Sequence, residues 1–387
     1  MSDDSKPLGK PPGRDLRADL CRGLALWMIV VNHTPGNWLN GFTLKNFSLS
    51  DATEVFVLLA GYAAAFAYAG MADRQGWAPA AASLGARIAK LYVVHIFLLV
   101  VFTAQVGFSA ATLDRAVYLD ELALDAFAEQ PYRTLLEALL LRFQPAFLDI
   151  LPLYIVLLAM LIPGLLLRRR PWLVLGLSLG LWLGARALGV NFPRWQEGGW
   201  FFNPLGWQVL FVLGFLLGQS VRGAVSLPLP PRNALVTAGA VAVLVIGLLA
   251  MIASEAQPWL LEPLPLWVPG FLASMDKTSL HPARLASILA LAYLVGAYLP
   301  RDGWVVRAAW LRPFILMGRH SLPVFCFGIL LSFMVRLLLE VDDGWGMQVL
   351  ANALCLAALI TVAWIGEWSR STTRRRDPVL PAAAGSH

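Results

Sequence analysis

The sequence predicts an all-α integral membrane protein with about ten transmembrane helices. Of its 387 residues, 58% are hydrophobic and only 14% are charged, and the mean hydropathy is +0.66. A water-soluble domain carries roughly a quarter of charged residues, so this composition excludes that class. The apolar residues stand in long runs, and the 15 Trp and 25 Pro suit a chain with interfacial aromatic residues and kinked membrane helices.

The runs divide the chain in order. Residues 1–13 are polar and lack the pattern of a signal peptide, which predicts a disordered cytoplasmic tail, and residues 369–387 are expected to form a second tail. Residues 14–368 are predicted to form a single transmembrane domain. The runs that predict one helix each cover residues 19–36, 51–70, 87–107, 146–167, 171–188, 205–221, 234–253, 282–299, 313–338 and 346–367.

Lysine and arginine are concentrated in alternate loops, beginning with the segment before the first run. Short cytoplasmic loops carry this excess, so both termini are predicted to be cytoplasmic, and the net charge of +6 indicates orientation and not nucleic-acid binding. The longest outer loop, 108–145, is acidic and is predicted to contain a short amphipathic helix outside the membrane. The loops 189–204 and 254–281 hold tryptophans that suit either the membrane interface, which we favour, or stacking on sugars.

The first run carries ionisable residues near both of its ends. Ten residues separate Arg22 from His33, which corresponds to about 16 Å along a helix, or half a bilayer. Arg22, organised by Asp19 one turn away, can therefore hold an anion at the cytoplasmic side while His33 lies in the outer half. A histidine that is neutral at cytoplasmic pH can accept a proton from a hydroxyl group.

The second run begins with Asp51 and Glu54, which lie three residues apart and so share one face of a helix. Two interpretations remain open. A carboxylate close to His33 would orient the imidazole, or the two acids would cap the start of their own helix.

Other polar residues interrupt later runs, and such residues inside a membrane are functional candidates that otherwise join helices or reach the surface. Arg87 and Lys90 lie one turn apart and, with Arg22, suit either phosphate binding or cytoplasmic anchoring. The remaining candidates, which would line the route between the two ends, are His95, Asp149, Gln208, His320 and Ser321. His320 and Ser321 precede the helix-kinking Pro323.

Several of these motifs together resemble acyltransferase family 3 and, within it, the OpgC-type proteins that succinylate osmoregulated periplasmic glucans. The resemblance extends from about Arg14 to the tenth run and depends on order and spacing more than on any one motif. Lys90 stands where the wider family commonly has arginine, which keeps the charge but loses the bidentate contact to a phosphate. The motifs are RADLCRGLALWMIVVNH, SDATEVFVLLAGY, LDILPLY, FNPLGWQVLFVLG and GRHSLPVF.

This resemblance implies an enzyme of the bacterial inner membrane that transfers an acyl group from cytoplasmic acyl-CoA to a periplasmic glucan. His33 is the expected general base, oriented by Asp51 or Glu54, and Ser321, Asn32 or Gln208 could stabilise the oxyanion of the thioester. Transfer through an acylated histidine is the competing mechanism. No permanently bound cofactor and no metal are expected, and the donor, succinyl-CoA or another acyl-CoA, stays open together with the oligomeric state.

A transporter or flippase for a glycan or an organic anion is the rival function class. Buried acids, histidines and kinked helices also build proton-coupled transport sites. The sequence shows no inverted repeat of the kind that marks many transporters, and the motifs occur in the order of the acyltransferase family. We therefore favour the acyltransferase.

Overall fold

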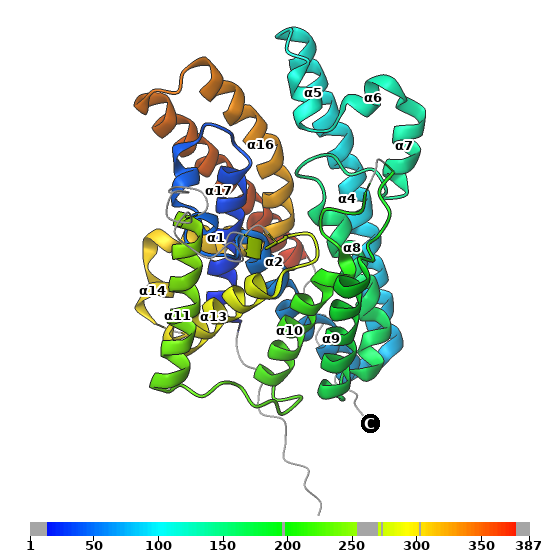
Figure 1. Ribbon diagram of the computed structural model, residues 1–387, viewed down its shortest axis with the longest axis vertical. Coiled ribbons are helices and arrows are strands. Elements are labelled where there is room, and N and C mark those ends of the chain that lie inside the picture. Colours follow the sequence, from blue (N-terminus) through cyan, green and yellow to red (C-terminus); the bar gives the residue numbers. More distant parts are fainter. Residues whose placement is uncertain (1–13, 196–197, 254–269, 272–273, 302, 377–387) are drawn as a thin grey trace, which may run out of the picture. The chain divides into compact units, whose positions relative to one another are not determined.

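The computed structural model describes residues 14–195, 198–253, 270–271, 274–301 and 303–376, and Figure 1 shows their arrangement. Within these ranges the regular structure is helical, apart from an isolated β-bridge between Pro193 and Gly199. In the part of the chain that the structure describes, eight helices are long and apolar enough to cross a membrane: Ala52–Gln75, Trp77–Thr112, Ile150–Leu167, Pro171–Leu188, Pro204–Val221, Ala234–Met251, Ser321–Val341 and Trp345–Thr372. The prediction of an all-α membrane protein is confirmed.

These spans correspond to the labelled helices as follows. The first combines α2 (Ala52–Ala64), a π-helical turn (Ala65–Ala69) and α3 (Gly70–Gln75). The others are α4 (Trp77–Thr112), α8 (Ile150–Gly164) with a short 3-10 extension, α9 (Pro171–Leu188), α10 (Pro204–Val221), α11 (Ala234–Met251), α16 (Ser321–Val341) and α17 (Trp345–Arg376). Two further predicted runs form the shorter helices α1 (Leu16–Asn32) and α13 (Pro282–Tyr298), each of 17 residues, at the lower limit for spanning.

The ninth predicted run, 313–338, is not one helix. It is divided into α15 (Arg312–Arg319) and α16 at His320, whose backbone angles of φ −111° and ψ 39° are not helical. Pro323 gives the physical reason, because its ring lacks an N–H group and would clash with the carbonyl of Arg319 in a continuous helix. The third predicted run was also too short, since α4 begins ten residues earlier, at Trp77.

The acidic loop 108–145 contains three short helices where one was expected. After α4 ends at Thr112, the chain forms α5 (Val117–Glu121), α6 (Asp125–Glu129) and α7 (Pro131–Leu139). In the loop that follows α9, Trp200 packs against Phe192 within the loop, and Trp195 packs against Phe143 in the segment between α7 and α8. The tryptophans expected in the loop 254–281, Trp259 and Trp267, lie outside the described residues.

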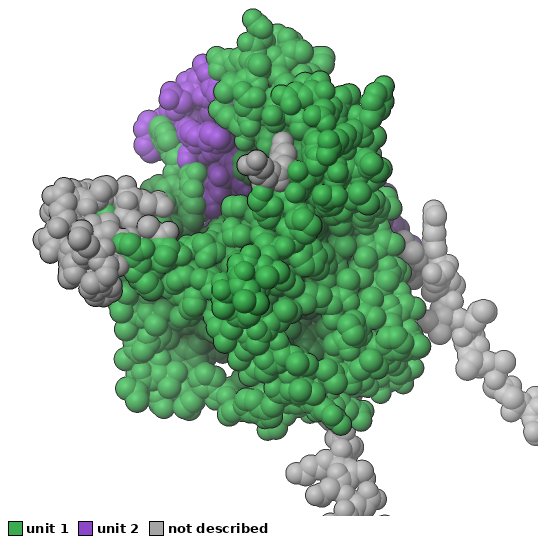
Figure 2. Space-filling model, turned by 45° about the vertical axis from the view of Figure 1, so that its right-hand side comes forward, with its two compact units in different colours: residues 1–15, 38–300 green, residues 16–37, 301–387 purple. Residues whose placement is uncertain are grey.

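The chain divides into two compact units, which Figure 2 colours separately. Unit 1 comprises residues 1–15 and 38–300, and unit 2 comprises residues 16–37 and 301–387. Unit 2 therefore combines α1 with α14 (Trp304–Arg307), α15, α16 and α17. The single domain expected for residues 14–368 stays a prediction, and so does the cytoplasmic position of both termini.

Glycines allow helices to meet backbone to backbone inside each unit. In unit 1, a Cβ on Gly61 of α2 would overlap the carbonyl oxygen of Phe211 on α10. In unit 2, a Cβ on Gly318 of α15 would overlap the carbonyl oxygen of Asp19 on α1. Close approach of this kind drives helix association in a bilayer, where apolar burial contributes little, and it fixes α15 against the charged end of α1.

Candidate active site

The N-terminal end of α1 carries a buried carboxylate between two arginines, all within unit 2. Asp19 is only 3% exposed. One of its oxygens lies 3.6 Å from Nη1 of Arg22, and the other lies 3.7 Å from Nε of Arg319 on α15. Arg22 also donates a 3.5 Å hydrogen bond to the carbonyl of Gly318. Two guanidinium groups thus share one carboxylate, and guanidinium groups suit the binding of an anion.

A histidine–carboxylate pair follows immediately at the break between α15 and α16. His320 is 4% exposed, and its Nε2 lies 2.8 Å from Oε2 of Glu367 on α17. Ser321, the next residue, begins α16 and is half-buried. The sequence suggested a histidine–carboxylate pair at His33. In unit 2 such a pair is present at His320, and its partner, Glu367, was not indicated by the sequence.

His33 lies at the other end of α1, directly after the last helical residue, Asn32, and its side chain is half-buried. Its amide donates to the carbonyls of Ile29 and Val30 at 3.0 and 3.2 Å, which closes the last turn of the helix. The position at the end of the first helix is the one that the sequence predicted.

The turn after His33 is fixed by α16 and α17. Thr34 donates to the carbonyl of Val30 at 2.9 Å and to that of Ser332 at 3.4 Å. The amides of Asn37 and Asn352 bond each other in both directions, at 2.9 and 3.2 Å. Gln348 donates a 2.8 Å bond to the carbonyl of Gly36, which adopts a positive φ of 77°. These buried polar groups satisfy one another, so the backbone beside His33 has little freedom to move.

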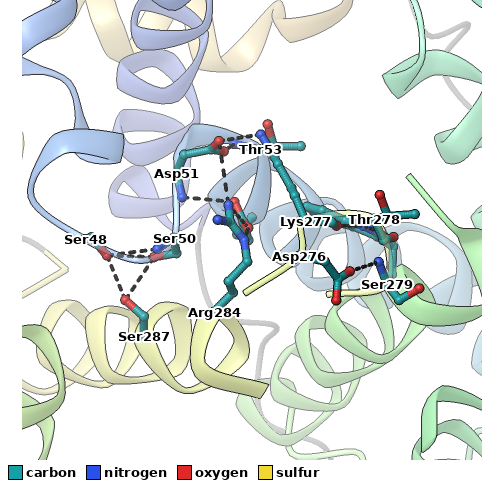
Figure 3. A network of polar contacts seen from close by, with 12 residues as sticks. Ser48, Ser50, Asp51, Thr53, Asp276, Lys277, Thr278, Ser279, Arg284 and Ser287 are labelled. Atoms are coloured by element: carbon teal, nitrogen blue, oxygen red, sulfur yellow. Dashed lines mark hydrogen bonds and ion pairs between the residues drawn. The ribbon is translucent and has the colours of Figure 1, made fainter. Parts of the chain in front are cut away.

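The second predicted helix, α2, begins in a charged network in unit 1, shown in Figure 3. Asp51 is the N-cap: its Oδ1 accepts from the amide of Thr53 at 2.6 Å, and Glu54 accepts from the amide of Asp51 at 3.0 Å. Lys277 contacts Asp51 at 2.5 Å, and Arg284 of α13 contacts Glu54 at 2.6 Å. The capping interpretation of the two acids is confirmed, and orientation of His33 by either acid stays a prediction.

Neighbouring cations keep the Asp51 carboxylate ionised. Burial alone would raise the pKa of Asp51, but the Lys277 ammonium and the Arg284 guanidinium hold it well below its usual range. Glu54 is completely buried. Lys277 and Arg284 thus lie against the two acids, and Ser48, Ser50 and Ser287 form a hydroxyl cluster next to them, as Figure 3 shows.

Asp149 and Gln208 also lie in unit 1 but in different surroundings. Asp149 precedes α8, and burial raises its carboxyl pKa to about 6 although Lys277 and Arg194 act in the opposite direction. Gln208 of α10 accepts from the Ser178 hydroxyl at 2.7 Å and donates to the carbonyls of Ser178 and Leu205 at 2.8 and 3.2 Å. The bonds to Ser178 join α10 to α9, and the bond to Leu205 lies within α10.

The sequence suggested that the candidates on α4 stand at the start of their helix, but the helix begins earlier, at Trp77. Arg87 and Lys90 lie about three turns into α4, with Arg87 half-buried and Lys90 exposed. His95 is completely buried, and neither ring nitrogen has a hydrogen-bond partner within the described part of the chain. All three belong to unit 1, so their relation to Arg22 stays a prediction. Across the same described ranges, no three His, Cys, Asp or Glu side chains are grouped so as to hold a metal ion.

The comparison with protein families decides which kind of membrane protein carries these groups. A family model described as "OpgC protein" matches residues 14–371. The chain belongs to the OpgC family. No curated protein and no solved structure matches it. The family match spans both units and every candidate residue, and it supports a transferase of the glucan-succinylating type.

Five residues of this OpgC protein that contact the candidate residues or the turn after His33 were not predicted from the sequence: Lys277, Arg284, Gln348, Asn352 and Glu367. Two signals could have found most of them. Lys277 and Arg284 are basic residues near an outer loop that the positive-inside pattern leaves poor in charge. Gln348 and Asn352 are amides one turn apart in an apolar run, where polar groups are costly. Glu367 stands at the end of its run and gives no such signal.

Proposed function

We propose that this OpgC family protein is an inner-membrane O-acyltransferase that moves an acyl group, most consistent with succinyl, from cytoplasmic acyl-CoA to hydroxyl groups of a periplasmic glucan. One observation carries the proposal beyond the family match. A single helix, α1, bears Asp19 and Arg22 near its start, where Arg319 of α15 lies against Asp19, and is followed at its end by His33 on a fixed turn. The separation of about 16 Å suits a donor bound at one side and an acceptor bound at the other.

His33 acts as the general base in this mechanism. A sugar hydroxyl is a weak nucleophile, so a neutral imidazole that removes its proton assists attack on the thioester carbonyl. The new C–O bond forms as the C–S bond breaks, and the proton passes from His33 to the departing CoA thiolate. The buried turn supports this role because a base must be held within hydrogen-bond reach of the proton that it accepts.

The cationic groups would bind the donor. Arg22 and Arg319, with their orientation fixed by Asp19, offer positive charge for the phosphates of CoA, and Arg87 and Lys90 extend that role if they face the same side. His320 and Ser321 follow Arg319 directly and would contact the thioester end. No resident cofactor is required, because acyl-CoA enters and leaves as a substrate.

The outer groups would bind the acceptor. Asp51 and Glu54, held by Lys277 and Arg284, present paired charges of both signs, which suit sugar hydroxyls as donors and acceptors. Asp149 and His95 would line the route from the donor. We keep the orienting role of Asp51 or Glu54 toward His33 as part of this proposal.

The test is acyl transfer by the purified protein in liposomes with succinyl-CoA and a periplasmic glucan. We expect thioester cleavage that depends on glucan, and a loss of at least about 100-fold in His33→Ala, within the range for removal of a general base. His281→Asn is the matched control, since it replaces a histidine at the start of α13 with another good N-cap residue. Full transfer by folded His33→Ala, or glucan transport without thioester cleavage, would refute the proposal.

A further inference from the structure

A second arginine cluster lies in unit 1, on the side of the membrane that the pattern of basic residues predicts to be cytoplasmic. Asp73 accepts from Nε of Arg168 and from Nη2 of Arg222, each at 2.9 Å. Nε of Arg169 lies 4.0 Å from the same carboxylate. Three guanidinium groups share one carboxylate, and the exposed Arg170 follows in the chain. The cluster thus keeps a substantial positive charge, and the Arg169 side chain is 75% exposed.

An apolar groove of about 170 Å³ runs along α8, α9 and α10. Its walls are mostly aliphatic and aromatic, and its two polar residues, Ser178 and Gln208, are hydrogen-bonded to each other. The walls therefore favour hydrocarbon over any polar ligand. Lining residues include Leu157, Leu161, Val174, Leu177, Phe211 and Phe215.

The groove and the arginine cluster adjoin each other. Gly164 and Leu167 line the groove, and Arg168 follows Leu167 directly in the chain. On the facing helix, Gln219 lies one turn beyond the groove residue Phe215 and donates a 3.3 Å hydrogen bond to the carbonyl of Arg168. A molecule with an apolar chain in the groove would therefore have its polar end beside the arginines.

We propose that this surface binds an anionic phospholipid of the cytoplasmic leaflet, with one acyl chain in the groove and the phosphate at Arg169 and Arg170. The arginine cluster and the groove each account for one part of such a lipid, the phosphate and the acyl chain. Arginines alone would suit any phosphate, and the groove alone would suit any apolar chain. Their adjacency selects a molecule that has both parts, and guanidinium groups bind phosphate oxygens in a bidentate geometry. This proposal does not rest on the proposed transfer reaction.

The experiment uses the whole protein in liposomes with spin-labelled phosphatidylglycerol or phosphatidylcholine, and measures the fraction of label that the protein immobilises. Arg169→Gln/Arg170→Gln removes charge at the head of the site. Gly164→Leu fills the groove, and the nearest atom to its new Cβ, Cδ1 of Leu161, is at an ordinary 3.9 Å. Arg312→Gln, an exposed arginine of unit 2, and Gly176→Leu, at an open position of α9 outside the groove, are the controls.

We expect the native protein to prefer phosphatidylglycerol, and the double arginine variant to lose about fivefold of that preference or more, since one basic residue near a membrane contributes ~1 kcal/mol. Gly164→Leu should lower the immobilised fraction of both lipids, and neither control should change it. The proposal is overturned if the native protein shows no preference between the lipids. It is equally overturned if free CoA displaces phosphatidylglycerol and its own binding falls in the arginine variant, because the cluster would then be a nucleotide site.

Discussion

Removing the Asn352 amide should damage catalysis more than it damages the fold. Asn352 exchanges two hydrogen bonds with Asn37, at 2.9 and 3.2 Å, and both side chains are at most 9% exposed. Asn352→Ala leaves the Asn37 amide buried without these bonds, which costs about 1–3 kcal/mol of folding free energy. The turn after His33 then loses one of its contacts to α17. A displacement of about 1 Å at a catalytic group can reduce the rate by roughly 100-fold.

The assay combines thermal unfolding in detergent with acyl transfer from succinyl-CoA to glucan. We expect a lower melting temperature, a kcat reduced by one to two orders of magnitude and a KM for succinyl-CoA that is almost unchanged, because the donor end of α1 is distant. Asn37→Leu/Asn352→Leu is the matched comparison, since it removes both polar groups and should recover stability without recovering kcat. A destabilised Asn352→Ala protein with the native kcat would show that this turn does not position the base.

Three further predictions concern the charged groups. Arg284→Met should destabilise unit 1 by about 3–5 kcal/mol by leaving Glu54 buried without its partner, and adding Glu54→Gln should recover most of that loss in thermal unfolding. Because the folded pKa of Asp149 is raised to about 6, the stability that Asp149 contributes is complete below about pH 4 and is lost as the pH rises through 6. Asp149→Asn should abolish this pH dependence of the unfolding free energy, which amounts to about 3 kcal/mol between pH 4 and 8. An unchanged pH profile in the variant would contradict the assignment. Glu367→Gln should change stability by less than ~1 kcal/mol, since the Glu367 side chain is 49% exposed, and a larger loss would mean that its pair with His320 is better shielded than the structure indicates.

The sequence predicted what local patterns determine. Apolar runs of spanning length identified the membrane helices, and the position of His33 at the end of the first helix was predicted, although the run was drawn to residue 36 and α1 ends at Asn32. For Asp51 and Glu54 the sequence allowed two interpretations, capping of α2 or orientation of His33. Capping could be foreseen because acids at the start of a helix accept hydrogen bonds from its free amides whatever else they contact. The break at His320 was indicated by Pro323, but its consequence, two helices in place of one, was not.

The partners of the candidate residues could not be predicted, because they come from distant parts of the chain. Asn37 and Asn352 are 315 residues apart, and Asp51 and Lys277 are 226 residues apart. One sequence holds no periodicity that connects such positions. His320 illustrates the result: its residue type and its place beside a proline were recognised, while Glu367, which fixes its ring, depends on how α17 packs on α15.

The most direct test of the central claim is mass spectrometry of periplasmic glucans from cells that carry the intact gene, no gene, or the His33→Ala variant. We predict that an acyl mass, succinyl in size, is present on the glucans in the first case and absent in the other two, with the same glucan backbone in all three. Glucans that keep the same acyl mass in every strain would contradict the account. Disappearance of the glucans themselves from the periplasm would contradict it too and would indicate transport.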